Sequence, residues 1–402
     1  MRSWNNPTSR VFLAGHGADR GADQFFYVIL AWAAAHSGSA LSFGLIMTVG
    51  TLSRAVVTVF GGAVADRAGV VEAAIWSLAA RVVLMLAFGW VLTASPLSSW
   101  ALTGVALAFG FADGVHLPAM ESAGTLVVDR EHLRSFQGVL SWINKTATAA
   151  ATPIAAVLIG WQGASAAAVT GAAVLGLALV SVVALHRRGL RSPARVDGQL
   201  LEMVRAGFSY ALGRPQLATL LALFAIVNGL TLAPLVTGVA LTGRDNNWSA
   251  GQYGLGYVGF FVGSLIGAGF IAVGRRYVAH GLRWSLMFVL GGCVGLAGMA
   301  VAGAPLIVCG FAALMGAFFG AGAALMMGDI KTETPPEYMG RVMSMVTMSI
   351  AGLQPVGYAL YGWLAGVTSV ATAGVTTAVT LAVAAAIVFV SPVARRRQVA
   401  PA

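Results

Sequence analysis

The sequence contains very few charged residues. Only 9% of its 402 residues are Asp, Glu, Lys or Arg, whereas 58% are hydrophobic. A soluble globular domain has about 25% charged residues, so this composition excludes a water-soluble protein. The apolar residues form long continuous runs, not the short alternating segments that a membrane β-barrel would need. We therefore expect an all-α integral membrane protein.

Cysteine is also scarce, and common enzyme motifs are missing. Cys293 and Cys309 both lie in apolar runs, which excludes a disulfide framework. The sequence has no Walker loop, no H-E-x-x-H or G-x-S-x-G motif and no Cys/His metal cluster. Gly254–Gly259 matches a dinucleotide fingerprint, but it lies in an apolar run and continues through Gly263 and Gly267 as a helix-packing ridge. We expect no enzyme activity, no cofactor and no metal.

The apolar runs are long enough for twelve membrane-spanning helices, since one span needs about 20 residues. The expected helices cover residues 11–35, 41–65, 72–95, 97–120, 136–160, 164–186, 216–241, 250–274, 282–303, 305–328, 341–365 and 368–391.

The longest polar stretch, residues 187–215, divides these helices into two sets of six. It predicts an N-terminal six-helix bundle over residues 1–186, a cytoplasmic linker and a C-terminal bundle over residues 216–402. Pro153 with Gly160-Trp161 in the fifth helix matches Pro355 with Gly362-Trp363 in the eleventh, which favours a duplication. We expect two six-helix repeats around a central cavity.

The basic residues predict the orientation of the chain. Most of its 24 lysines and arginines fall in connections on one side of the expected helices, whereas the other side has only Arg244. By the positive-inside rule, both termini are then cytoplasmic. The net charge of +10 therefore reflects membrane topology and does not indicate nucleic-acid binding. We expect a multi-pass protein of the cell inner membrane.

Carboxylates inside the expected helices are the main candidates for ion chemistry, because a charge at the bilayer centre costs at least about 2.5–3.5 kcal/mol. Asp19 and Asp23 are four residues apart and share a helix face, whereas Arg20 should point elsewhere. We expect Asp19, Asp23 and Asp113 to form a proton relay. Arg54 stays protonated and would tune a carboxylate. The alternative is a permanent structural ion pair.

Three further polar residues within the helices have less distinctive patterns. Arg81 and Lys145 lie close enough to the expected interface for their side chains to snorkel into the headgroup region. His116 titrates in the physiological range, although a single histidine in a helix is more often a hydrogen-bonded packing residue.

Several motifs resemble the major facilitator superfamily. Residues 61–69 read GGAVADRAG, which is similar to the superfamily's G-x-x-x-D-R-x-G connection between helices 2 and 3. Residues 335–342 read PPEYMGRV, which resembles the P-P-E-x-x-G-R-V pattern of the twelve-helix drug:proton antiporters, including macrolide-efflux and enterobactin-exporter proteins. Ala112-Asp113 with Pro118-Ala119 resembles the end of helix 4 in the same branch.

This resemblance implies a monomeric secondary active transporter that exports small amphipathic compounds by proton antiport. It also implies a cytoplasmic gate formed by Asp66, Arg67, Arg341 and Glu121. In this superfamily helices 1, 4, 7 and 10 line the substrate cavity, and the candidate lining residues here are Phe25, Phe26, Phe109, Asn228, Phe318, Phe319 and Met327.

Two other functions are compatible with the same residues. The first is an uptake symporter or facilitator of the same fold, because the direction of transport depends on coupling and not on helix number. The second is a membrane sensor or assembly protein that does not transport. For an exporter or an uptake transporter, the partners are a small-molecule substrate and the lipid bilayer, with protons as the expected coupling ion.

Overall fold

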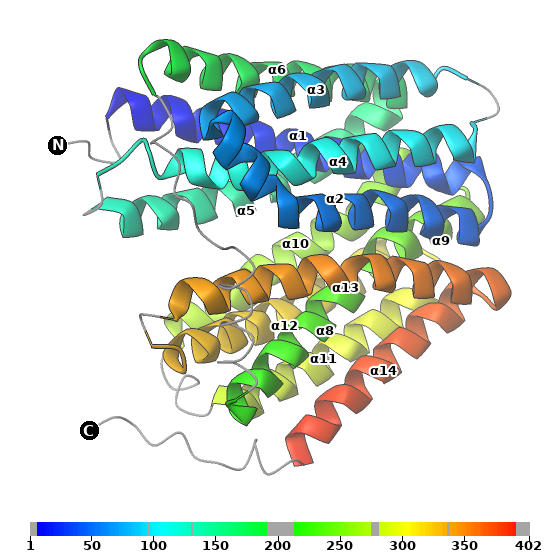
Figure 1. Cartoon of the computed structure of the whole chain (residues 1–402). Coiled ribbons are helices and arrows are strands. Elements are labelled where there is room, and N and C mark those ends of the chain that lie inside the picture. Colours follow the sequence, from blue (N-terminus) through cyan, green and yellow to red (C-terminus); the bar gives the residue numbers. More distant parts are fainter. Residues whose placement is uncertain are drawn as a thin grey trace. The chain divides into compact units, whose positions relative to one another are not determined.

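A computed structural model describes residues 6–94, 97–129, 132–190, 213–274, 281–335 and 338–390. Within these ranges the chain is helical, with short connections and no β-strand (Figure 1). Each of the twelve expected helices is present there, and the observed ends lie within a few residues of the predicted ones.

The helices of the first half are α1 (Pro7–Ser37), α2 (Ala40–Ala68), α3 (Val70–Val91), α4 (Ser99–Gly124), α5 (Leu133–Gln162) and α6 (Ala164–Arg187). Those of the second half are α8 (Pro215–Ala233), η2 (Pro234–Gly238), α9 (Val239–Asp245), α10 (Ala250–Val273), α11 (Gly281–Val301), α12 (Pro305–Thr332), α13 (Met339–Val367) and α14 (Val370–Val390). The seventh expected helix corresponds to α8, η2 and α9 in succession, because η2 is a π-helical turn inside it.

The chain divides into two compact units. The first contains residues 1–38, 45–197 and 249–254, and the second contains residues 39–44, 198–248 and 255–402. In the first unit, α1 and α3 both pack along α6, and α3 also packs along α4 (Figure 1). Most of the expected linker, residues 191–212, lies outside the described residues, and the two-repeat arrangement stays a prediction.

Nine helices within the described ranges are long and apolar enough to cross a membrane. Helix α1 is not among these nine, although it has 31 residues. Its middle contains Asp19, Arg20 and Asp23, and each charge at mid-helix opposes insertion by about 2.5–3.5 kcal/mol. Charged partners on other helices must therefore stabilise α1 in a bilayer.

The connection between α2 and α3 is shorter than the sequence motif suggested. The expected helices left residues 66–71 as the connection, but α2 continues to Ala68 and only Gly69 separates it from α3. Gly69 has φ of 93°, a left-handed conformation that a residue with a side chain rarely adopts. The helix ends there because the backbone of Gly69 leaves the right-handed helical conformation.

Helices α10 and α12 pack through small residues, as the ridge in the sequence predicted. A β-carbon added to Gly259, Gly263 or Gly267 would collide with the backbone carbonyl oxygen of Cys309, Ala313 or Ala317, respectively. Glycine lets the two backbones approach closely, and such contacts are a main source of helix association in lipid.

We expect Gly263→Leu to destabilise the second unit, because the new side chain has no space beside Ala313. Overpacking of this kind costs about 1–3 kcal/mol, which should lower the thermal unfolding temperature of the purified protein. Gly269→Leu is the matched control, since Gly269 lies on the same helix with no atom within 4 Å of an added β-carbon. Equal unfolding temperatures for the two variants would contradict the close packing of α10 and α12.

Candidate functional site

Helix α1 places three charged side chains in the interior of the first unit. Arg20 Nη2 lies 2.7 Å from Asp19 Oδ2, and Arg20 Nη1 lies 3.1 Å from Asp23 Oδ2. The expectation that Arg20 points away from the two aspartates was therefore wrong. Residues three apart are neighbours on a helix, and the long arginine side chain bends back to bind both carboxylates.

Arg81 of α3 binds the same two aspartates and is fully buried. Its Nη1 lies 2.6 Å from Asp19 Oδ1, and its Nη2 contacts Asp23 Oδ1. The prediction that Arg81 snorkels was wrong, because the carboxylates of α1 provide a partner inside the unit. Its guanidinium carbon also lies 5.1 Å from the ring centre of Phe109, within cation–π range. Lys145, by contrast, is exposed.

A second ion pair joins α2 and α4. Arg54 Nε lies 3.1 Å from Asp113 Oδ2, and Arg54 Nη1 donates a hydrogen bond to Tyr27 Oη at 3.2 Å. Asp113 Oδ1 lies 3.7 Å from Arg81 Nη2, so Arg81 connects this pair to the aspartates of α1. We call Asp19, Arg20, Asp23, Arg54, Arg81 and Asp113 the charge cluster.

The charge cluster contains as many guanidinium groups as carboxylates. The carboxylates are buried, and each contacts at least one arginine. Removing one partner of a buried ion pair costs about 3–5 kcal/mol, because the other charge is left uncompensated. Because the numbers are equal, the cluster is electrically neutral. Any gain or loss of a proton in it would disturb several contacts at once.

Two buried histidines lie against the charge cluster. His116 Nε2 lies 3.1 Å from Asp19 Oδ2, and His116 Nδ1 lies 3.0 Å from the hydroxyl oxygen of Ser77. On α1, His16 Nε2 lies 2.7 Å from the side-chain oxygen of Asn144. His116 and Ser77 thus extend the cluster by polar contacts between α3 and α4.

Several members of this site were not among the residues expected to couple protons. Arg20, Arg81 and His116 were each assigned another role, and Tyr27 and Ser77 were not considered. Two spacings carry a usable signal, because Ser77 and Arg81 are four residues apart and Asp113 and His116 are three apart. Each pair shares one helix face, which directs four polar groups to the same interior.

The expected cavity residues of the first half lie next to the charge cluster. Phe26 and Phe109 are buried, with their rings stacked at a centroid distance of 3.6 Å. Phe25 is also buried. Phe26 and Phe109 therefore pack α1 against α4, whereas Phe25 lies against Gly171 of α6.

The expected cavity residues of the second half belong to two helices, α8 and α12. Phe318 and Phe319 of α12 lie against Gly291 and Gly292 of α11. Met327 is half-buried. Asn228 is half-buried in α8, and its side-chain amide donates a hydrogen bond to the carbonyl oxygen of Phe224 at 2.8 Å.

Two of the four expected gate residues can be placed by their side chains. Arg67 at the end of α2 and Glu121 near the end of α4 are both exposed. Asp66 belongs to α2 and Arg341 to α13, but the side chains of both lie outside the described part of the structure.

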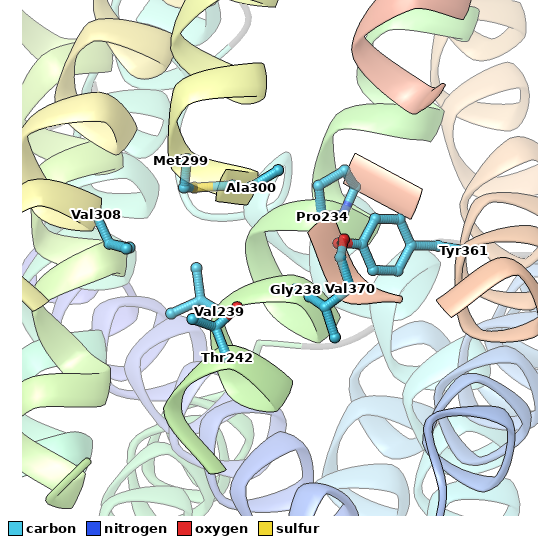
Figure 2. A pocket seen from close by; sticks show the side chains of 9 residues that line it. All are labelled: Pro234, Gly238, Val239, Thr242, Met299, Ala300, Val308, Tyr361 and Val370. Atoms are coloured by element: carbon cyan, nitrogen blue, oxygen red, sulfur yellow. The ribbon is translucent and has the colours of Figure 1, made fainter. Parts of the chain in front are cut away.

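The second unit contains a small cavity beside the π-helical turn (Figure 2). Its volume of about 10 Å³ approaches the space that one water molecule needs. Tyr361 lies at its edge and donates a hydrogen bond from its hydroxyl to the Val370 carbonyl oxygen at 3.3 Å. The cavity is lined by Pro234, Gly238, Val239, Thr242, Met299, Ala300, Val308, Tyr361 and Val370.

A larger hollow of about 200 Å³ lies between α8, α13 and α14. Leu360 and Trp363, which border it, are more than half exposed, so this hollow opens on the apolar outer face of the unit. None of the expected cavity residues borders it.

No protein-family model matches the chain. The sequence is 27% identical over 275 residues to the enterobactin exporter EntS of Escherichia coli O127:H6 (strain E2348/69), and 26% identical to that of strain HS. Each match covers 66% of this chain and 62% of the exporter, so the chain spans less than two thirds of the relatives' length.

Solved structures with a similar fold are also transporters. A POT family transporter in complex with 5-aminolevulinic acid gives a TM-score of 0.70 at 12% identity and covers 96% of each chain. The nucleoside transporter NupG gives 0.72 at 13% identity and covers 96% of this chain and all of its own. The predicted resemblance to enterobactin exporters is therefore confirmed, and the fold is shared with solved transporters. The chain is a multi-pass membrane protein whose relatives are transporters and not enzymes.

Proposed function

Because the fold is that of major facilitator transporters and the sequence is similar to an enterobactin exporter, we propose that this chain is a secondary active transporter. It exports small amphipathic compounds in exchange for protons. The observation that carries this proposal is the buried, neutral charge cluster on α1, α2, α3 and α4. Intramembrane ionisable residues of this kind commonly form proton relays in transporters.

The charge cluster offers a physical basis for coupling. A proton bound within it would add one positive charge and weaken contacts between α1, α3 and α4. Protons and substrate would then favour different arrangements of these helices, which is the differential affinity that a ligand-driven switch requires. A purely structural set of ion pairs would give no such response to a pH gradient.

The substrate would bind at the midplane in a central cavity between two six-helix repeats. Phe25, Phe26 and Phe109 would supply apolar contacts from the first repeat, and Asn228 a polar contact from the second. Phe318, Phe319 and Met327 would complete the lining. Both termini would be cytoplasmic, with Asp66, Arg67, Glu121 and Arg341 at the cytoplasmic gate of a monomer.

Transport can be tested with purified protein in liposomes under an imposed pH gradient, with enterobactin and the amphipathic cation ethidium as probes. We expect the probe to move against its gradient in the direction opposite to protons. A protonophore should abolish this movement, and empty liposomes provide the baseline.

The alternatives give different results in the same assay. If the probe and the protons move in the same direction, the protein is a symporter, and export by antiport is contradicted. Wild-type protein that moves neither probe, while it remains folded, would contradict the proposal for these compounds.

A further inference from the structure

We propose that His116 holds the exchanged proton, while the three carboxylates of the charge cluster stay ionised and act as fixed counter-charges. This inference rests on the proposed function, because it identifies the protonation site of that antiporter. It moves the coupling role from Asp19, Asp23 and Asp113 to a histidine that the sequence pattern favoured as a packing residue.

The first argument is the environment of the carboxylates. Asp19 and Asp23 each contact both Arg20 and Arg81, and Asp113 contacts Arg54. Arginine does not release its proton inside proteins. Protonating any of these carboxylates would therefore leave a guanidinium group with too little negative charge around it, in an interior where unpaired charges are costly.

The second argument is the pair of oxygens that face the His116 ring. Nε2 faces Asp19 Oδ2 at 3.1 Å, and Nδ1 faces Ser77 Oγ at 3.0 Å. The Ser77 hydroxyl lies 3.1 Å from the carbonyl oxygen of Ala74 and donates its hydrogen to it. Both ring nitrogens then face an acceptor, an arrangement that suits a ring with a proton on each nitrogen.

The same contacts suit the neutral ring after one small rotation. When the ring keeps only the proton that faces Asp19, the Ser77 hydroxyl can turn from Ala74 and donate to Nδ1, because a hydroxyl both donates and accepts. His116 can therefore gain or lose a proton without leaving a ring nitrogen unpaired.

The charged groups around His116 determine what its proton would do. Asp19 is the nearest, and Arg20 and His16 belong to the same helix α1, while Arg81 approaches from α3. Asp113 lies one turn away on α4 and carries the contact to Arg54 of α2. With the neutral ring the cluster has no net charge, so a protonated ring gives it one positive charge. Asp19 must then share its two oxygens among Arg20, Arg81 and the charged ring. We expect this competition to loosen α1 from α3.

His116→Gln tests the proposal, because glutamine keeps hydrogen-bonding groups but cannot be charged. The first measurement is the number of protons that the purified protein binds between about pH 8 and pH 5. We expect the variant to bind one proton fewer than the wild type. Equal proton numbers would overturn the proposal, and this readout needs no substrate.

The second measurement is transport of enterobactin in liposomes. His116→Gln should reduce accumulation driven by a pH gradient by at least about tenfold, whereas exchange of enterobactin at equal pH should continue. His36→Gln is the control, because His36 is exposed and its ring contacts only the end of α1. Gradient-driven accumulation that survives His116→Gln would overturn the proposal.

Ser77→Ala is a milder variant in case His116→Gln does not fold. It removes the oxygen that alternates between Ala74 and the ring, so pH-driven transport should fall severalfold while the protein stays folded. Unchanged transport in Ser77→Ala would overturn the role given to the Ser77 contact. If the wild type transports neither enterobactin nor ethidium, the proposed function fails for these compounds, whereas the proton count still tests the role of His116.

Discussion

Arg81→Met is expected to prevent most of the protein from reaching a stable folded state. Arg81 is fully buried and contacts Asp19 and Asp23, so its loss leaves the charge cluster with one excess negative charge in the interior. Breaking a buried ion pair from one side costs about 3–5 kcal/mol, a large part of the 5–15 kcal/mol that stabilises a typical protein. The measurement is the yield of monodisperse protein in size-exclusion chromatography, followed by thermal unfolding.

Two controls separate charge balance from the loss of a large side chain. Arg244→Met removes a partly exposed arginine paired with Asp245 and should change little. Combining Arg81→Met with Asp19→Asn restores equal numbers of positive and negative groups, and this double variant should recover much of the lost yield. If the double variant is no better than Arg81→Met, packing and not charge balance explains the effect.

Asp113→Asn is expected to reduce pH-driven transport by at least about tenfold while the protein remains folded. The substitution gives the charge cluster one permanent positive charge, the same net charge that a bound proton would add. A proton bound at His116 would then raise the net charge of the cluster from one to two positive charges, and neighbouring like charges oppose this step. Folding should survive, because the Arg54 side chain is 29% exposed and retains its bond to Tyr27.

The measurement compares gradient-driven accumulation of enterobactin with its exchange at equal pH, in liposomes of the same protein content. Only the first should decline strongly. Asp245→Asn is the matched control, since Asp245 is half exposed and lies at the end of α9. Full gradient-driven accumulation in Asp113→Asn would show that the net charge of the cluster does not govern coupling.

The helices could be predicted from sequence because long apolar runs and short polar connections determine them directly. The π-helical turn could not be predicted, since Pro234 in an apolar run is equally compatible with a kinked α-helix. The shortness of the α2–α3 connection was also missed, because a G-x-x-x-D-R-x-G motif does not state where helical geometry stops. Only the left-handed conformation of Gly69 determines that point.

The charge cluster was predicted in part. Its carboxylates could be recognised because a charge in an apolar run is costly unless a partner or a function accounts for it. These carboxylates belong to Asp19, Asp23 and Asp113. Their partners could not be recognised, since the choice between snorkelling and pairing for Arg81 depends on how α1 and α3 are rotated about their axes. Sequence spacing gives the face of one helix, but it does not say which face of another helix lies opposite.

The distribution of charge over α1 has a consequence for how the chain enters the membrane during synthesis. Arg20 compensates only one of the two aspartates on this helix, and the second partner, Arg81, is synthesised only after the whole of α2. A single helix with an uncompensated charge inserts unfavourably, by about 2.5–3.5 kcal/mol. We therefore expect α1 to remain near the insertion machinery until α3 emerges, so α1 settles in the bilayer only after the two helices that follow it have been made.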